Sequence, residues 1–323
     1  MSIPLHDVLV TGASGFVGTR LIQLLKASGY RTLGLDLVPG PFTDVLADVR
    51  DPKSLEHYVP QDGIVFHLAS VVGIVEVLKR PEECYNCSVE GTRNLCQSAE
   101  KQRARIVFTS SSEVYGDGGG ELLSENSPLP PNHGPWPRAS YPEGKLRAEE
   151  LVQTFHARGG DGRIARFFNV TGPGQDWTKG PVLPTFIHHA LKGIPLPVIG
   201  EGGDVRCLQH VDDAARGLMK LGLTEGLSGR IINLGGMDSV SVEQLAHRVL
   251  SLLNTPGTIK KVSATERYGG PSRPCTHRIP TLDLARDLLK HEPKIPLDKI
   301  ILETAAAFRK EDGVDEKEHC AEA

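Results

Sequence analysis

Two side chains one helical turn apart, Tyr141 and Lys145, form the pattern YPEGK. At this spacing both side chains lie on one face of a helix. A lysine ammonium beside a phenol favours the phenolate and lowers the tyrosine pKa, so Tyr141 can act as a base toward a substrate hydroxyl. Upstream, residues 106–116 read IVFTSSSEVYG, which predicts a strand that ends in hydroxyl groups. Side chains at the carboxyl end of such a strand face the crevice in which parallel α/β sheets bind ligands.

A glycine-rich turn near the N-terminus predicts a dinucleotide site. Residues 8–18 read VLVTGASGFVG, a short apolar strand followed by Gly12, Gly15 and Gly18 and then by a helix. This spacing lets the backbone turn tightly and approach a pyrophosphate at the helix N-terminus. Asp36, at the end of the second predicted strand, can accept hydrogen bonds from the adenosine ribose and would repel a 2′-phosphate. The sequence therefore predicts NAD rather than NADP as the cofactor.

The elements that must position these residues alternate between strands and helices. Over the first 110 residues, short apolar runs alternate with amphipathic segments, which is typical of βαβ units and a parallel sheet. After Gly172, proline and glycine cluster and the pattern changes. We therefore predict an α/β protein, a doubly wound Rossmann sheet with a smaller C-terminal substrate-binding lobe. The predicted parts are an NAD-binding domain over 1–171 with 203–236 partly returning to it, a lobe over 172–310, and an acidic flexible tail over 311–323.

Composition excludes several classes of protein. The 323 residues carry 36 basic and 40 acidic side chains, a net charge of −4, so the basic excess of a protein that binds nucleic acid or an anionic membrane is missing. The chain shows no signal peptide and no membrane-length apolar run, and its six cysteines fit a reducing compartment. Cys84 and Cys87 form a C-x-x-C pair without a second pair at zinc spacing. We expect a cytoplasmic protein without a metal site and without nucleic-acid or membrane partners.

The order of these motifs resembles that of a known family. The glycine-rich turn, the strand-end serines and the Tyr-Lys pair together are similar to the extended short-chain dehydrogenases/reductases, in the nucleotide-sugar epimerase/dehydratase group. The resemblance runs from Val8 to about Arg309. The matching stretches are TGASGFVG, HLAS, GTRNL, SSSEVYG, YPEGK, ARFFNVTGPG, VLPTFI, RCLQHVDD and LARDLLKHEPKIPLDKII. Within the group, the loop GPWPRASYPEGK and the strand RCLQHV resemble UDP-glucuronate decarboxylases.

The motifs and the resemblance together give three sets of candidate site residues. The catalytic set is Ser111, Glu113, Tyr141 and Lys145. The cofactor-binding set is Gly12, Ser14, Gly15, Phe16, Val17, Gly18, Asp36, Asp48, Val49, Leu68, Ala69, Ser70, Tyr141, Lys145 and Phe168. The substrate-binding set, which the resemblance assigns to a UDP-linked sugar, is Ser112, Asn169, Val182, Phe186, Arg206 and Arg278.

The resemblance leaves three reactions open, all of which pass through a 4-keto sugar. They are decarboxylation of a UDP-uronate, which we favour, 4-epimerisation of a UDP-sugar or UDP-uronate, and 4,6-dehydration of an NDP-sugar. Ser88, the stretch VVGIV at 71–75 and Thr281 depart from the family pattern. A non-catalytic NAD-binding scaffold would not keep Ser111 and the Tyr-Lys pair, and a reductase of small carbonyls would favour NADP. By analogy with the family, the helices near 85–101 and 141–157 would pair two chains into a homodimer.

Overall fold

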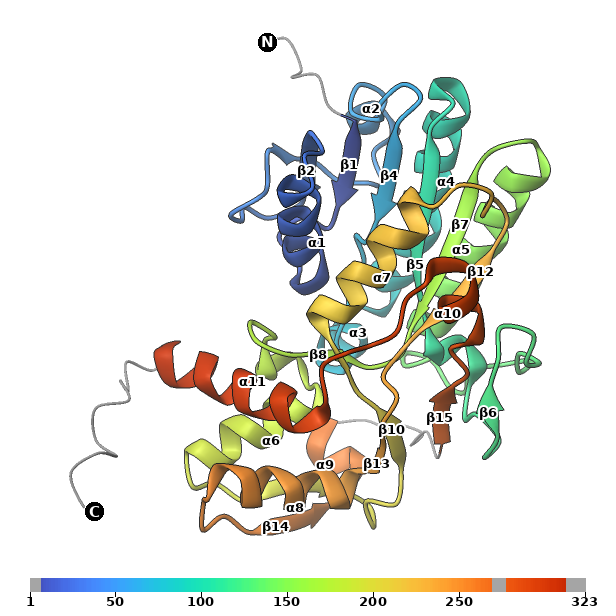
Figure 1. Cartoon of the computed structure of the whole chain (residues 1–323). Helices are drawn as coiled ribbons and strands as arrows, with labels where there is room; N and C mark the ends of the chain where they lie inside the picture. The colour runs from blue at the N-terminus through green and yellow to red at the C-terminus, as the bar shows by residue number, and fades with distance from the viewer. Residues whose placement is uncertain (1–6, 269–276, 312–323) are drawn as a thin grey trace.

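The computed structural model describes residues 7–268 and 277–311, and its centre is a seven-stranded sheet in which every neighbouring pair is parallel (Figure 1). The strands are β1 Val8–Thr11, β2 Thr32–Asp36, β3 Val45–Leu46, β4 Ile64–His67, β5 Arg105–Ser111, β7 Gly162–Phe167 and β12 Ile231–Leu234. Their order is β12-β7-β5-β4-β1-β2-β3, so the winding direction reverses between β1 and β4. A ligand crevice opens at the carboxyl ends of the strands beside such a reversal. The predicted Rossmann fold is confirmed.

Helices cover both faces of this sheet, because successive strand side chains point to opposite faces and both sets are apolar. One face packs against α2 Pro52–Leu55, α4 Pro81–Gln102 and α5 Ser140–Ala157. The other packs against α1 Phe16–Ala27, α7 Val211–Leu223 and α10 Asp283–Leu289. In β5, for example, Ile106 and Phe108 face the first core and Val107 faces the second.

A smaller lobe lies at the carboxyl end of the sheet (Figure 1). Its own core forms where three helices pack together with a short two-stranded sheet. These elements are α6 Val182–Leu191, α8 Val242–Leu253, α11 Leu297–Glu311, β9 Leu196–Ile199 and β14 Ile259–Val262. A further small sheet has the order β13 Ser239–Ser241, β10 Val205–Cys207, β15 His277–Pro280 and β6 Leu122–Leu123. The connecting elements are α3 Ile74–Lys79, β8 Val170–Thr171, β11 Gln209–His210, α9 Ala264–Tyr268 and the 3-10 turns η1 Ser112–Tyr115 and η2 Trp177–Lys179.

The predicted boundary at residue 172 does not describe the lobes fully, because later segments return to the Rossmann sheet. The segment 203–236 supplies strand β12 of that sheet and helix α7, which packs on it. The segment 283–289, predicted to belong to the lobe, packs on the Rossmann sheet instead, because Ala285 and Leu289 join its second core. The predicted acidic tail lies outside the described residues except for Glu311, the last residue of α11. No helix of the described part is both long and apolar enough to cross a membrane.

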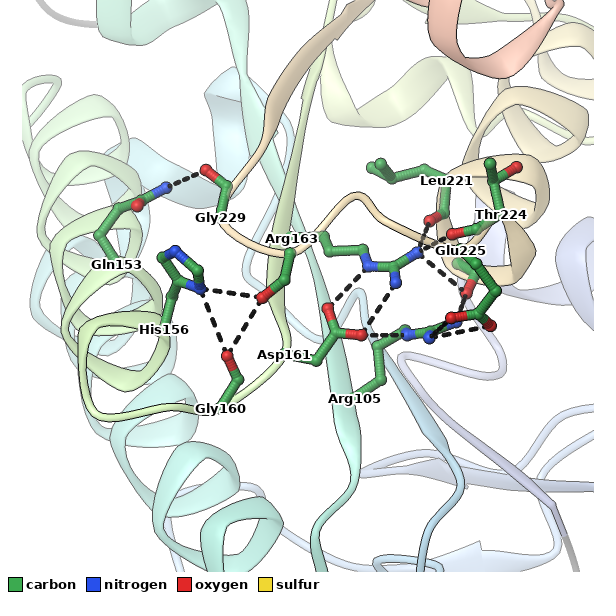
Figure 2. A network of polar contacts seen from close by, with 12 residues as sticks. Arg105, Gln153, His156, Gly160, Asp161, Arg163, Leu221, Thr224, Glu225 and Gly229 are labelled. Carbon is green, nitrogen blue, oxygen red and sulfur yellow. Dashed lines mark hydrogen bonds and ion pairs between the residues drawn. The ribbon is translucent and has the colours of Figure 1, made fainter.

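A buried arginine connects the elements at the amino-terminal ends of the strands (Figure 2). Arg163 is 1% exposed, and two of its guanidinium nitrogens donate to Asp161 at 2.8 Å. Its Nη1 donates to the carbonyl of Leu221 at 2.7 Å and to that of Thr224. These carbonyls belong to the end of α7, where a helix leaves its last acceptors unsatisfied. Arg105 also bonds Asp161, at 2.6 Å, so β5, β7 and α7 are tied together at the edge opposite the crevice.

Candidate active site

The glycine-rich turn between β1 and α1 leaves no room for side chains. Gly12 has φ +76°, and a Cβ there would lie 2.8 Å from the backbone nitrogen of Ala69. A Cβ on Gly18 would lie 2.0 Å from the carbonyl oxygen of Gly12. Helix α1 begins at Phe16 without a side-chain cap on its first turn. The first backbone N–H groups of α1 are therefore left for an anionic ligand, and the cradle fits the diphosphate of a dinucleotide.

Asp36 ends β2 beside this turn. Its Oδ2 accepts from the backbone N–H of Ser14 at 3.0 Å and its Oδ1 from that of Val38 at 3.2 Å. The carboxylate is thus held at the turn, where it can meet the adenosine ribose. Asp48 is engaged differently, because Arg50 bonds it at 2.6–3.0 Å and lowers the pKa of its carboxyl group.

The end of β4 is tied to the same turn. The hydroxyl of Thr11 bonds the Nδ1 of His67 at 2.8 Å and accepts from the backbone N–H of Ala69 at 3.3 Å. Leu68 donates its N–H to the carbonyl of Thr11 at 3.1 Å. His67 is fully buried, and burial lowers its pKa to about 3, so its ring is neutral. The predicted cofactor-lining segment Leu68–Ser70 therefore follows a fixed, uncharged anchor.

Tyr141 and Lys145 both lie in the first turns of α5, against the end of β5. The hydroxyl of Ser111 is close enough to Tyr141 to lower the pKa of its phenol. Lys145 is 2% exposed, and its Nζ donates to the carbonyl of Thr109 at 2.9 Å and lies 5.8 Å from the centre of the Tyr141 ring. Burial lowers the pKa of Lys145 to about 8. The structure therefore brings Ser111, Tyr141 and Lys145 together as the motifs predict.

The expected lowering of the Tyr141 pKa is wrong for the protein alone. Burial raises the pKa of this phenol, and the nearby charge of Glu113 raises it further. The hydrogen bond from Ser111 and the charge of Arg138 act in the opposite direction and are smaller. The sequence showed the lysine but gave no measure of the desolvation of the phenol, which depends on packing between distant segments.

Glu113, in η1, lies between two guanidinium groups. It forms an ion pair with Arg138, and its Oε1 is 4.0 Å from the Nη1 of Arg278. Burial favours the neutral acid, but the charges of Arg138 and Arg278 outweigh it, and the pKa of Glu113 is lowered. All three side chains line a cavity of about 470 Å³, which is also lined by residues 115–119, 121–123, 127–130 and 132–133 and by Pro142. Glu113 is therefore a carboxylate at neutral pH, within a mostly cationic group.

The two predicted substrate arginines are neighbours. Arg206 in β10 and Arg278 in β15 are partners in the parallel register. Arg206 also pairs with Asp204 at 3.2 Å, and its charge acts on Glu113. Asn169, at φ +39°, donates from Nδ2 to the carbonyl of Cys207 at 3.4 Å, which places it beside the same small sheet. Adjacent guanidinium groups are suited to a diphosphate.

Several other predicted contacts have structural roles. Val49, Phe168 and Phe186 are at most 3% exposed and lie in hydrophobic cores. Ser112 is 3% exposed in η1, and Val182 opens α6 half-buried. That these five residues contact a ligand stays a prediction, and so does the same assignment for Asp48.

Two residues of the site have no role in the sequence-based sets. Arg138 stands three residues before Tyr141. In the sequence it is the one cation of the loop segment GPWPRAS, which leads into the catalytic helix. His67 belongs to the stretch HLAS. Its signal was a histidine at the end of an apolar strand, which is more often a packed core residue than a site residue.

The fold and the site define an enzyme that binds a dinucleotide and oxidises an alcohol. A Rossmann sheet with a tight glycine turn, a strand-end serine and a Tyr-Lys pair on one helix face suits hydride transfer. The model of the NAD dependent epimerase/dehydratase family matches residues 8–235, and the chain belongs to this family. Its cofactor is NAD.

Similar proteins cover nearly the whole chain. A UDP-N-acetyl-alpha-D-glucosaminuronate decarboxylase of Bacillus cytotoxicus is 28% identical over 93% of this chain and 97% of the relative. UDP-glucuronic acid decarboxylase 1 of Xenopus tropicalis is 32% identical over 94% of this chain and 72% of the relative. Among solved structures, MoeE5 in complex with UDP-glucose and NAD is 28% identical, covers 94% of this chain and 99% of its own, and has a TM-score of 0.81.

Proposed function

We propose that this enzyme decarboxylates a UDP-linked uronate through a 4-keto intermediate. The observation that carries the proposal is the position of Glu113 between Arg138 and Arg278 beside Tyr141. This group carries more positive than negative charge, which suits a sugar that bears a carboxylate better than a neutral hexose. The relatives named UDP-glucuronic acid decarboxylase, at 32% identity, support the same substrate class.

The proposed first step is oxidation at C4. The glycine turn and Asp36 would hold NAD, which would supply the hydride acceptor for C4. Tyr141 removes the proton of the 4-hydroxyl, and the nearby hydroxyl of Ser111 is placed to bond the same oxygen. Lys145, held by the carbonyl of Thr109, keeps a positive charge near the phenol below about pH 8.

The second step is the loss of CO₂. A C4 ketone makes a C5 carboxylate part of a β-keto acid, so the bond between C5 and the carboxylate carbon breaks and its electron pair passes to the oxygen at C4 as an enolate. One proton from solvent then adds at C5. Because the pKa of Glu113 is lowered, it is ionised and orients the sugar or a water rather than donating that proton itself. Returned hydride and the Tyr141 proton restore the alcohol.

The test is the mass of the product formed from UDP-glucuronate by the NAD-loaded enzyme. Loss of one CO₂ supports the proposal. An unchanged mass with inverted C4 would support 4-epimerisation, and water loss from a neutral NDP-hexose would support dehydration. Glu113→Gln should slow CO₂ release while NAD and UDP binding stay within about twofold, because hydride transfer belongs to Tyr141 and Lys145. If the Gln variant decarboxylated at the wild-type rate, Glu113 would have no part in the second step.

4-Epimerisation of a uronate is the second candidate. MoeE5 in complex with UDP-glucuronic acid and NAD is 26% identical and has a TM-score of 0.81, which supports a uronate as substrate without naming the reaction. The buried Nε of Arg278 has no hydrogen-bond partner among the described residues, so it could hold a carboxylate that stays on the sugar. The same product analysis separates this outcome from decarboxylation.

The proposal extends to assembly and compartment. We propose a homodimer formed through α4 and α5, which pack side by side on one face of the sheet and carry the exposed residues Arg93 and Arg147. Light scattering on the purified chain tests it. The four cysteines of the described part are free and buried thiols, which supports a reducing compartment such as the cytoplasm.

A further inference from the structure

Arg138 belongs to the loop that enters the catalytic helix, and its position ties it to the reacting end of the substrate. Its guanidinium pairs with Glu113, and their side chains are 20% and 23% exposed. Both line the cavity, as does Pro142, the residue after Tyr141. The charges of Arg138 and Tyr141 also act on each other. Arg138 is therefore close to the hydroxyl that must meet the sugar O4.

Three guanidinium groups act on the carboxylate of Glu113. Arg138 faces it from the loop and Arg278 from β15, while Arg206 acts on it from β10 and is itself paired with Asp204 at 3.2 Å. The Nε of Arg278 is buried and lacks a hydrogen-bond partner within the described residues. A buried donor without an acceptor costs free energy, so an anionic group bound beside Arg278 would be stabilised.

The position of a sugar carboxylate follows from the chemistry at C4. Tyr141 must contact O4, and a carboxylate on C5 is only two bonds from C4, so it lies beside Tyr141. Arg206 and Arg278 are neighbours on the strands of the small sheet, and Arg278 lies 4.0 Å from Glu113. Arg138, by contrast, is on the same segment as Tyr141, and an arginine fork can take a carboxylate through two parallel hydrogen bonds.

We propose that Arg138 is the residue that recognises the carboxylate of the UDP-uronate, exchanging its ion pair with Glu113 for one with the substrate. The inference rests on the proposed function in assuming a UDP-uronate as substrate. A neutral sugar offers nothing to Arg138 and leaves the pair with Glu113 in place. Glu113 and the substrate carboxylate therefore compete for the guanidinium of Arg138. This competition lets the enzyme distinguish an acidic sugar from a neutral one.

The test compares the affinities of UDP-glucuronate and UDP-glucose, which differ only in carboxylate against hydroxymethyl. Calorimetry is done on the NAD-loaded full chain carrying Tyr141→Phe, so that neither ligand is consumed. The preference for UDP-glucuronate should fall about 10- to 100-fold in Arg138→Met, the range of one charged hydrogen bond. Arg138→Lys should keep part of the preference, because the charge remains and the fork is lost. Arg248→Met, at an exposed arginine of α8 paired with Asp298, is the matched control and should leave the preference unchanged.

Glu113→Gln distinguishes two roles of Arg138. Arg138 either binds the substrate carboxylate or only neutralises the charge of Glu113. Alone it should strengthen the preference for UDP-glucuronate, because Arg138 loses its competitor. In the double variant Arg138→Met/Glu113→Gln the preference should stay low. A preference restored in the double variant, or unchanged in Arg138→Met, would show that Arg138 only neutralises Glu113 and would overturn the inference. Product analysis of the wild type is independent of these affinities, so failure of the proposed reaction and failure of this recognition are distinguishable.

Discussion

The buried neutral ring of His67 predicts a specific loss of stability in acid. Its pKa is lowered to about 3 by burial, with a smaller contribution from the charge of Lys145. The unfolded chain has an ordinary histidine pKa of about 6.5, so it binds a proton that the native state excludes. Stability therefore falls as the pH drops below about 6.5 and stops falling near pH 3. The sign is that of a histidine buried without its proton.

The magnitude follows from linkage. Each pH unit between those two values removes about 1.4 kcal/mol of unfolding free energy per excluded proton. From about pH 6.5 to pH 4.5 the loss due to His67 is roughly 2–3 kcal/mol, a large part of the stability of an ordinary domain. His291, with a pKa lowered to about 4 by burial, and His210, lowered in the same direction, add to the total in wild type.

The perturbation that isolates this effect is His67→Asn, which removes the titrating ring. Urea unfolding at about pH 6.5 and pH 4.5 should show a pH-dependent loss that is roughly 2–3 kcal/mol smaller than in wild type, whatever the variant's absolute stability. His57→Asn, at an exposed histidine, is the control and should keep the wild-type slope. An equal slope in His67→Asn and wild type would refute the assignment of a neutral, proton-excluding ring to His67.

Three further predictions use other parts of the structure. Asp36→Ala should weaken NAD by about 1.5–3 kcal/mol, one charged hydrogen bond, in a calorimetric titration, and tighter binding of NADP than NAD by the wild type would contradict the role of Asp36. Tyr141→Phe should lower kcat by ~10²–10⁴ with an unchanged melting temperature, and near-normal turnover would remove Tyr141 from the mechanism. Arg163→Met should cost about 1–3 kcal/mol of stability in urea unfolding, because the carbonyls at the end of α7 lose their donor, while Asp161 keeps its bond to Arg105. The kcat/KM of Arg163→Met should stay normal, since Arg163 lies at the amino-terminal ends of the strands and Tyr141 at their carboxyl ends. A large loss of kcat/KM would show that the two ends are coupled.

Sequence reasoning succeeded where the signal is local. Strand and helix periodicity, the glycine spacing after β1 and the Tyr141–Lys145 repeat are each contained in a few consecutive residues, and the structure has all of them. It failed where the outcome depends on packing between distant segments. The Tyr141 pKa is governed by burial. The position of α10 is decided by the packing of Ala285 into the core of the Rossmann sheet. Neither can be read from a window of the chain.

The ion pair of Arg138 and Glu113 shows the same limit within the site. Glu113 follows β5, Arg138 precedes α5, and Arg278 comes from β15 more than a hundred residues later. The sequence presents Glu113 and Arg278 as separate candidates and gives Arg138 no role. Only the closure of the lobe onto the sheet makes them one electrostatic group, and only then does the pKa of Glu113 fall rather than rise.

The small sheet is what holds that group together. Strand β6 comes from the N-terminal half of the chain and pairs with β15 from the C-terminal half, while β15 also pairs with β10. The cavity wall at Leu123 and the cation at Arg278 are thus set by one register. Because side chains alternate between the faces of a sheet, a slip of one residue would turn Arg278 away from Glu113 and separate it from Arg206. A site fixed by strand register is preorganised, so binding free energy need not be spent on ordering the guanidinium groups. Under the proposed function, an acidic sugar would then meet Arg278 in a fixed position, and only Arg138 would have to change its partner.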